Sequence, residues 1–169
     1  MGCKMESIAY LDSKLGTLAL SASAKGISNL AFFDEEPSKD YMRSTAKNSL
    51  NLPIDSWFES LTSYFEAKSD LPNLPLDLSD YNHNRLHILQ YLRKIPVGEV
   101  RSYKQVGENL GKKNYARVVG NACASNKIAI LLPCHRVVAT NRKRSGYRWG
   151  VERKQALLAI EKSISEKNL

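Results

Sequence analysis

A proline-containing segment near the middle of the chain constrains its organisation most. Residues 71–78 read LPNLPLDL and include Pro72 and Pro75. Proline lacks a backbone N–H and disfavours the helical conformation in the residue before it, so this segment cannot be a regular helix. We therefore expect a boundary here, between one domain over residues 1–75 and a second over residues 76–169. A chain of 169 residues is long enough to bury a substantial core.

The two sides of this boundary differ in charge. Residues 1–75 hold 7 Lys and Arg against 10 Asp and Glu, a net −3, whereas residues 76–169 hold 18 against 7, a net +11. A basic half of this kind indicates a polyanionic partner such as nucleic acid, and a surface kept basic for solubility is the alternative. No apolar run approaches the ~20 residues that span a bilayer, and no signal-peptide pattern opens the chain. We expect no membrane association and a cytoplasmic location, or a nuclear one in a eukaryote.

The N-terminal half reads as a small antiparallel sheet followed by a helix. Apolar segments separated by turn residues predict strands near residues 8–11, 15–20 and 27–33. Trp57, Leu61, Tyr64 and Phe65 then repeat at helical spacing, and Asp55 before them is the expected N-cap.

The C-terminal half is predicted to be mostly helical. Leucines at 86, 89 and 92 mark a first helix. A capping box from Ser102 to Gln105 opens a second helix that closes at Gly111, and Asn114 is the expected cap of a third over about 115–125. Two helices joined by a short glycine-containing turn form a helix-turn-helix. The expected fold class is therefore α/β (α+β), with the sheet in the first domain and the helix-turn-helix in the second.

One face of the predicted third helix has an unusual composition. Arg117, Gly120, Asn121 and Ala124 share that face at helical spacing. Glycine inside a helix costs about 1 kcal/mol relative to alanine, so its presence needs a reason. Small residues beside one arginine suit close approach to a nucleic-acid groove, and packing against another helix explains them equally well.

The stretch ILLPCHRVV, residues 130–138, places a cysteine next to a histidine and an arginine between two apolar runs. We expect residues 128–132 to form a short buried strand that Pro133 ends. The turn would then lift Cys134 out of the strand at the edge of the core. An inert buried cysteine is the plain alternative. A nucleophilic role needs help, because a thiol of pKa about 8.5 is only a few per cent ionised at neutral pH, and His135 and Arg136 are suitable neighbours.

A carboxylate near the end of the chain is a suitable partner for His135. A helix is predicted from Val151 to about Lys162, and Glu161 lies on or beside its apolar stripe. A buried carboxylate needs a partner, and a nucleophile–base–orienter arrangement would pair it with the histidine.

Cysteine and histidine usage argues against a metal centre. Cys3, Cys123 and Cys134 are odd in number and form no C-x-x-C pair, so we expect free thiols in a reducing compartment. His83 and His87 stand at i, i+4, but a solvated or DNA-facing helix surface explains them better than a metal pair. We predict no metal and no other cofactor.

Taken together, the motifs resemble those of the O6-alkylguanine-DNA alkyltransferases. The resemblance covers roughly residues 86–161 and rests on the following segments: IPVGEV at 95–100, Ser102-Tyr103, ARVVGNA at 116–122, Asn126, PCHRV at 133–137, GYRWG at 146–150 and Glu161. The N-terminal part matches only in size and in its strands and helix.

This resemblance implies a role for each matching residue. Cys134 would accept the alkyl group, while His135, held by Glu161, would take the thiol proton through a water. Asn126 would brace the turn that carries the cysteine, and Tyr103 would hydrogen-bond the flipped base. The DNA-binding set would be Arg117, as the arginine that fills the vacated stack, with Ala116, Gly120, Asn121 and Arg136. The base pocket would consist of Val137, Tyr147, Arg148 and Trp149.

The resemblance also implies a partner and a reaction. The partner would be double-stranded DNA carrying O6-alkylguanine, entered from the minor groove by a monomer, and the transfer would be irreversible with a single turnover. Two features depart from the family pattern. The stretch 81–85 lacks the usual phenylalanine, and Trp149 is bulky where some relatives have glycine, so it should narrow the pocket mouth.

Three other classes of protein are alternatives. Alkyltransferase-like binders recognise the same lesion but lack the cysteine, which is present here. A cysteine hydrolase would turn over, and adjacent Cys and His would be an odd arrangement for it. A helix-turn-helix regulator would normally dimerise, yet no dimer stripe is visible in the sequence.

Overall fold

A three-stranded antiparallel sheet forms the N-terminal part of the protein. The structure is a computed structural model, and it describes residues 6–140 and 146–168. Strands β1 (Ser7–Ser13), β2 (Gly16–Ser23) and β3 (Gly26–Phe32) follow one another in sheet order β1-β2-β3. This confirms the predicted meander.

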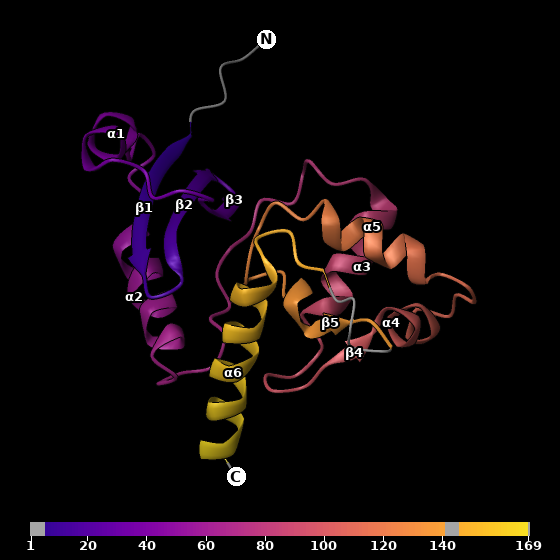
Figure 1. Ribbon diagram of the computed structural model, residues 1–169. Helices are drawn as coiled ribbons and strands as arrows, with labels where there is room; N and C mark the ends of the chain where they lie inside the picture. Colours follow the sequence, from indigo (N-terminus) through magenta and orange to yellow (C-terminus); the bar gives the residue numbers. More distant parts are fainter. Residues whose placement is uncertain (1–5, 141–145, 169) are drawn as a thin grey trace.

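Two helices accompany the sheet (Figure 1). Helix α2 (Ile54–Phe65) buries the four residues whose spacing predicted it. It begins two residues earlier than expected: Pro53 is the N-cap and Asp55 lies in the first turn, so the prediction that Asp55 caps the helix is wrong. The short helix α1 (Lys39–Thr45) was not predicted, because it buries none of its residues and carries no apolar periodicity.

The proline segment runs along the edge of β3 instead of standing free as a linker. Ile27 donates its backbone N–H to the Pro75 carbonyl at 2.9 Å and accepts from Asp77 N at 2.8 Å. A Cβ at Gly26 would lie 2.5 Å from the Pro75 backbone, and the φ of Gly26 is +134°, so only glycine allows this approach. The domain boundary at 75/76 stays a prediction.

The second half contributes to the same edge. Leu30 donates to the Lys127 carbonyl at 3.0 Å and accepts from Ala129 N at 2.7 Å, so Ile128 forms a single bridge to β3. Beyond it the chain turns at once. Ile130 has φ +70°, a left-handed conformation that is a genuine outlier for a β-branched residue. The prediction of a strand over residues 128–132 is therefore wrong: the segment is a buried turn.

Short helices pack around this turn (Figure 1). They are α3 (His83–Leu92), α4 (Tyr103–Asn109), α5 (Ala116–Ala124) and the 3₁₀ turn η1 (Cys134–Arg136). The two-residue strands β4 (Arg101–Ser102) and β5 (Val137–Val138) pair in parallel. The capping box of Ser102 and Gln105 is present, and Gly111 closes α4 with φ +72°. Asn114 does not cap α5; it has φ +55°, and Tyr115 is the N-cap.

The last helix, α6 (Val151–Lys167), lies between the N-terminal sheet and the helical half (Figure 1). It runs five residues beyond its predicted end. Arg153 joins it to the sheet, donating to the Leu15 and Phe33 carbonyls at 2.8 Å each. The α/β (α+β) fold class is thus confirmed. Within the described residues no helix is long and apolar enough to cross a membrane.

Candidate active site

Cys134 opens η1 directly after Pro133 and is only 3% exposed. Its Sγ lies 3.3 Å from Asn126 Nδ2, and the side chain faces a cavity of about 300 Å³. That cavity is lined by Tyr103, Gly120, Cys123, Ala124, Cys134, Gly146, Tyr147 and Arg148. A thiol in this position meets a ligand only from inside the cavity.

Burial raises the pKa of the Cys134 thiol to about 11, even though the hydrogen bond from Asn126 and the charge of Lys154 oppose the rise. Burial therefore outweighs the basic groups near the thiol. At neutral pH the thiol keeps its proton, so reaction at this sulfur needs a proton acceptor.

His135 is fully buried next to this thiol, and its two ring nitrogens have different surroundings. Nε2 lies 2.7 Å from Glu161 Oε1, whereas Nδ1 has no hydrogen-bond partner among the described residues. Burial lowers the pKa of His135 against the opposing effect of Glu161, so the ring is neutral at neutral pH. Because the Glu161 carboxylate can only accept, Nε2 carries the hydrogen and Nδ1 is left as an acceptor.

Glu161 is the centre of a buried polar cluster. Arg136 grips its carboxylate with Nε at 2.9 Å from Oε2 and Nη2 at 2.8 Å from Oε1. Tyr64 donates its hydroxyl to Oε1 at 2.8 Å, and the Gly98 amide lies 3.4 Å from Oε2. Burial alone would raise the pKa of Glu161, but the donors outweigh burial and lower it to about 2. The carboxylate is therefore ionised whenever the protein is folded near neutral pH.

The prediction that Arg136 contacts DNA is wrong. Its side chain is 2% exposed, and Nη1 donates to the Ile95 carbonyl while the rest of the guanidinium holds Glu161. A buried carboxylate needs this compensation, because an unpaired charge in the interior is strongly destabilising.

Asn126 braces the turn before the cysteine with both ends of its amide. Nδ2 donates to the Leu132 carbonyl at 2.9 Å, and Oδ1 accepts from Ile128 N at 2.9 Å. Tyr81, which is buried just before α3, adds its hydroxyl 3.4 Å from Oδ1 and accepts from Lys127 N. Tyr81 thus fills part of the stretch where the sequence lacks the family phenylalanine.

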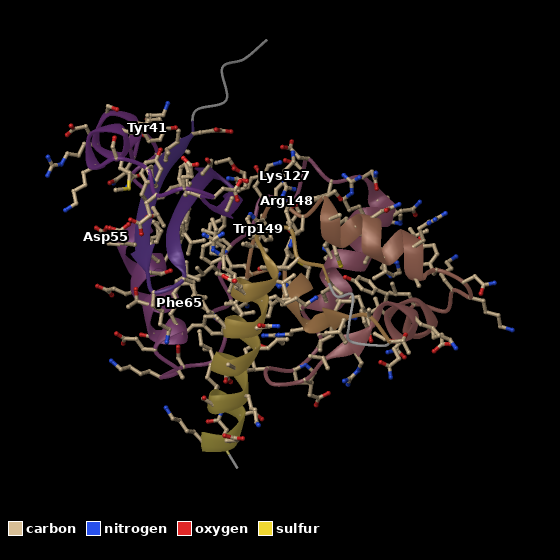
Figure 2. All side chains as sticks on the ribbon, viewed as in Figure 1. Tyr41, Asp55, Phe65, Lys127, Arg148 and Trp149 are labelled. Carbon is tan, nitrogen blue, oxygen red and sulfur yellow. The ribbon has the colours of Figure 1, made fainter. Side chains whose placement is uncertain are left out.

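The GYRWG segment forms the cavity wall opposite α5. Tyr147 lines the cavity, and its buried hydroxyl has no hydrogen-bond partner within the described residues. Arg148 donates to the Asn126 carbonyl at 2.8 Å and lies 5.7 Å from the centre of the Trp149 ring, and Figure 2 shows these two side chains next to each other. Trp149 is 5% exposed and packs edge-on against Tyr147 at 5.3 Å. It does not line the cavity, so the prediction that it narrows the mouth is wrong.

Val137 and Lys154 lie next to each other in the interior, and neither is among the residues that line the cavity, so the prediction that Val137 belongs to the base pocket is not confirmed. Both are buried, and Lys154 Nζ donates to the Val137 carbonyl at 2.6 Å and to the Gly146 carbonyl at 3.1 Å. Burial lowers the pKa of Lys154. Lys154 was not predicted from the sequence, although a lysine three positions before Leu157 on the apolar stripe was a usable signal.

The small-residue face of α5 is open to solvent. Arg117, Asn121 and Ala124 are exposed, and Ala116 and Gly120 are half-buried. A Cβ at Gly120 would lie 3.9 Å from the ring of Tyr103, the first residue of α4, which is an ordinary contact. Of the two explanations left open by the sequence, approach of an external surface is favoured.

Tyr103 connects this face to the cavity. It begins α4, lines the cavity, and burial raises its pKa to about 12, so its hydroxyl stays protonated and can donate. Of the predicted site residues, Cys134, His135, Glu161, Asn126, Tyr103, Tyr147 and Arg148 lie around the cavity or directly behind its walls.

No metal cluster is evident in the part of the chain that the structure describes: His, Cys, Asp and Glu form no group of three or more that could hold an ion. His83 and His87 are exposed on α3. Cys3 lies outside the described residues, and the absence of a metal stays a prediction.

Comparison with known proteins agrees with this geometry. Residues 8–78 match the 6-O-methylguanine DNA methyltransferase ribonuclease-like domain, and residues 84–163 match the DNA binding domain of the same family. The bifunctional transcriptional activator/DNA repair enzyme Ada of Escherichia coli is 36% identical over 164 residues, which cover 94% of this chain and 46% of that protein. The chain thus spans about half the length of that relative.

Two further relatives match over nearly their whole length. The methylated-DNA–protein-cysteine methyltransferase of Mycolicibacterium paratuberculosis is 35% identical over 161 residues, 94% of each chain. The crystal structure of Mycobacterium tuberculosis OGT in complex with DNA is 32% identical, covers 94% of each chain and superposes with a TM-score of 0.79. The chain therefore belongs to the 6-O-methylguanine DNA methyltransferase family.

Proposed function

We propose that this protein repairs O6-alkylguanine in DNA by transferring the alkyl group irreversibly to its own Cys134. The observation that carries the proposal is the position of Cys134: it faces a cavity and adjoins a neutral histidine whose free nitrogen is an acceptor. The M. tuberculosis relative with DNA in its structure supports DNA as the partner.

The transfer is a single displacement in which atoms balance. The Cys134 proton passes to His135 Nδ1 through a water, and Sγ attacks the alkyl carbon attached to O6 of guanine. The S–C bond forms as the C–O6 bond breaks, and the electron pair stays on the guanine. Tyr103 then donates its hydroxyl proton to the departing guanine, and the proton held by His135 returns through water to restore the tyrosine hydroxyl. The products are S-alkylcysteine and intact guanine.

Glu161 stabilises the protonated histidine formed during this step. Its carboxylate stays ionised because four donor groups hold it, as described above, so it can compensate the new charge without moving. Asn126 fixes the turn before Cys134 and keeps the sulfur directed into the cavity. Nothing in the reaction restores the thiol, so each chain reacts once.

Access to the cavity requires the damaged base to leave the duplex. Flipping costs a few kcal/mol and is easiest for a poorly paired base. The exposed face of α5 would lie in the minor groove, where small residues allow close approach and Arg117 fills the space that the base leaves. Basic residues of the C-terminal half would contact phosphates without reading sequence.

The protein must share a compartment with DNA, so we propose that it works in the cytoplasm, or in the nucleus of a eukaryote, as a monomer. A single chain contains every residue that the mechanism uses.

Intact-protein mass spectrometry tests the function directly. The wild-type protein is incubated with duplex DNA carrying one O6-methylguanine, and a gain of one methylene mass, limited to one per chain, is expected. The Cys134→Ala variant should gain nothing, whereas Cys123→Ala, which removes the second thiol that lines the cavity, should gain as the wild type does. Lesion-selective binding without any mass gain would identify a damage-sensing binder instead.

A further inference from the structure

The buried cluster around Glu161 contains one residue from the N-terminal half of the chain. Tyr64 lies on α2, is fully buried, and donates its hydroxyl to Glu161 Oε1 across 97 residues of sequence. Tyr64 does not contact Cys134 or the cavity, and the mechanism proposed above does not use it.

The Tyr64 hydroxyl donates to the same oxygen of Glu161 that lies next to His135 Nε2. Glu161 Oε1 accepts from Tyr64 at 2.8 Å, from His135 Nε2 at 2.7 Å and from Arg136 Nη2 at 2.8 Å. A carboxylate oxygen that shares its charge among three donors attracts each of their protons less. Removing the tyrosine donor would therefore strengthen the pull of Glu161 on the His135 proton.

We propose that Tyr64 is a positioning residue for the transfer, whose hydroxyl holds the Glu161 carboxylate so that His135 stays uncharged and keeps Nδ1 available as the acceptor. The inference rests on the proposed transfer to Cys134. It gives the N-terminal domain a part in the chemistry, in addition to its part in the fold.

The charged and titratable groups that face His135 and Glu161 come from several elements. Glu161 meets Tyr64 from α2, His135 and Arg136 from η1 and the Gly98 amide, and Tyr147 and Lys154 act on the pair from the cavity side. Arg136 and Lys154 both disfavour a charge on His135. Loss of the tyrosine donor leaves these groups in place, so its effect on His135 can be read separately.

The test compares the pH dependence of single-turnover methyl transfer in wild type and Tyr64→Phe. The expected result is an acid limb moved to higher pH by about half a unit to one unit, as loss of one hydrogen bond to a charged group implies. The rate below the limb should then fall about three- to tenfold, with the plateau at high pH nearly unchanged. Tyr10→Phe is the matched control, because it removes a tyrosine hydrogen bond to Thr45 in the same half of the chain.

A second measurement does not depend on activity. The chain has three histidines, so imidazole NMR resolves His135 from the exposed His83 and His87. In Tyr64→Phe the midpoint of the His135 titration should rise. Installing 3-fluorotyrosine at position 64, which strengthens the donor while keeping its shape, should lower it. This pair of opposite shifts keeps the inference testable even if the phenylalanine variant is less stable.

The outcomes separate this inference from the function on which it rests. Transfer by wild type with the same acid limb and the same His135 midpoint in Tyr64→Phe would overturn the role of Tyr64 alone. A uniform loss of rate at every pH, equal to the loss of folded protein, would also overturn it, since that is the effect of a purely structural residue. Absence of transfer in wild type would instead overturn the proposed function.

Discussion

The two sides of His135 differ in how completely their polar groups are paired. On the Nε2 side, Glu161 is held by Arg136 and Tyr64, and all three side chains are buried. On the Nδ1 side, that nitrogen and the Tyr147 hydroxyl have no hydrogen-bond partner among the described residues, and Tyr147 lines a cavity of about 300 Å³. The paired side fixes charge and orientation before a ligand arrives, and the unpaired side leaves acceptor and donor capacity for the ligand and water to use.

The largest expected effect comes from breaking the paired side at Arg136. Arg136→Leu leaves the Glu161 carboxylate buried without its cation, and loss of one partner of a buried pair costs about 3–5 kcal/mol of unfolding free energy. Urea denaturation measures the change. The control is Arg101→Leu, which removes an ion pair with Glu99 at 2.6 Å that is partly exposed and is worth about 1 kcal/mol or less. Equal losses of unfolding free energy in Arg136→Leu and Arg101→Leu would contradict the expected difference between the buried and the partly exposed ion pair.

Replacing His135 removes the acceptor nitrogen on the unpaired side. His135→Gln retains a donor for Glu161 but removes the acceptor nitrogen, so the methyl-transfer rate should fall by about 10²–10⁴-fold while the protein stays folded. Single-turnover kinetics with excess protein measures the rate. His87→Gln, at an exposed position of α3, should react as the wild type does. A rate within twofold of wild type for His135→Gln would rule out the proposed proton acceptor.

Acid should weaken the paired side. The pKa of Glu161 is lowered to about 2, so the stability that its ionised form contributes is present above the unfolded pKa and is lost as pH falls toward 2. The pKa of His135 is also lowered, so unfolding gains a proton as pH falls below about 6.5, with the same sign. We expect the unfolding free energy to decrease steadily from pH 7 to pH 4.

A variant shows how much of this decrease in unfolding free energy comes from Glu161. Urea midpoints for wild type and Glu161→Gln should converge as pH falls, because the variant lacks the carboxylate that wild type must protonate. Hydrogen bonds from Ser23 and Ser79 lower the pKa of Asp77 to about 2. Asp77 titrates in both proteins, so its contribution cancels in the comparison. Midpoints that stay parallel down to pH 4 would contradict the assignment.

The smallest effect is expected at Cys123, the second thiol that lines the cavity. Burial raises its pKa strongly, and no histidine serves it as a base. Cys123→Ala should therefore transfer methyl groups within about twofold of the wild-type rate and lose on the order of 1 kcal/mol of stability or less. The same kinetic and denaturation experiments measure both quantities, and a loss of transfer would show that the cavity needs both sulfurs.

The sequence was informative where chemistry is local. The capping box at Ser102, the meander turns and the apolar stripe of α2 depend on neighbouring residues, and all three were predicted. The pairing of His135 with Glu161 was also predicted, since a carboxylate on an apolar stripe requires a partner.

The errors arose where a distant group decides the outcome. Residues 128–132 have the composition of a strand, but the Asn126 side chain takes the Ile128 amide and the chain turns. Arg136 counted as a basic residue near a nucleophile, and sequence alone did not show that its charge is used by Glu161. Tyr64 was predicted as a core residue, because helical spacing shows that a side chain is buried and says nothing about what its hydroxyl meets.

The long separation between Tyr64 and Glu161 bears on how the protein is made. A chain emerging from the ribosome at about 5–20 residues per second completes the sheet and α2 long before it synthesises Glu161. His135 is likewise translated 26 residues ahead of the carboxylate that orients it. Cys134 and His135 are therefore synthesised some seconds before Glu161, the carboxylate that orients the histidine. We expect that a nascent or truncated chain that ends before α6 does not accept an alkyl group.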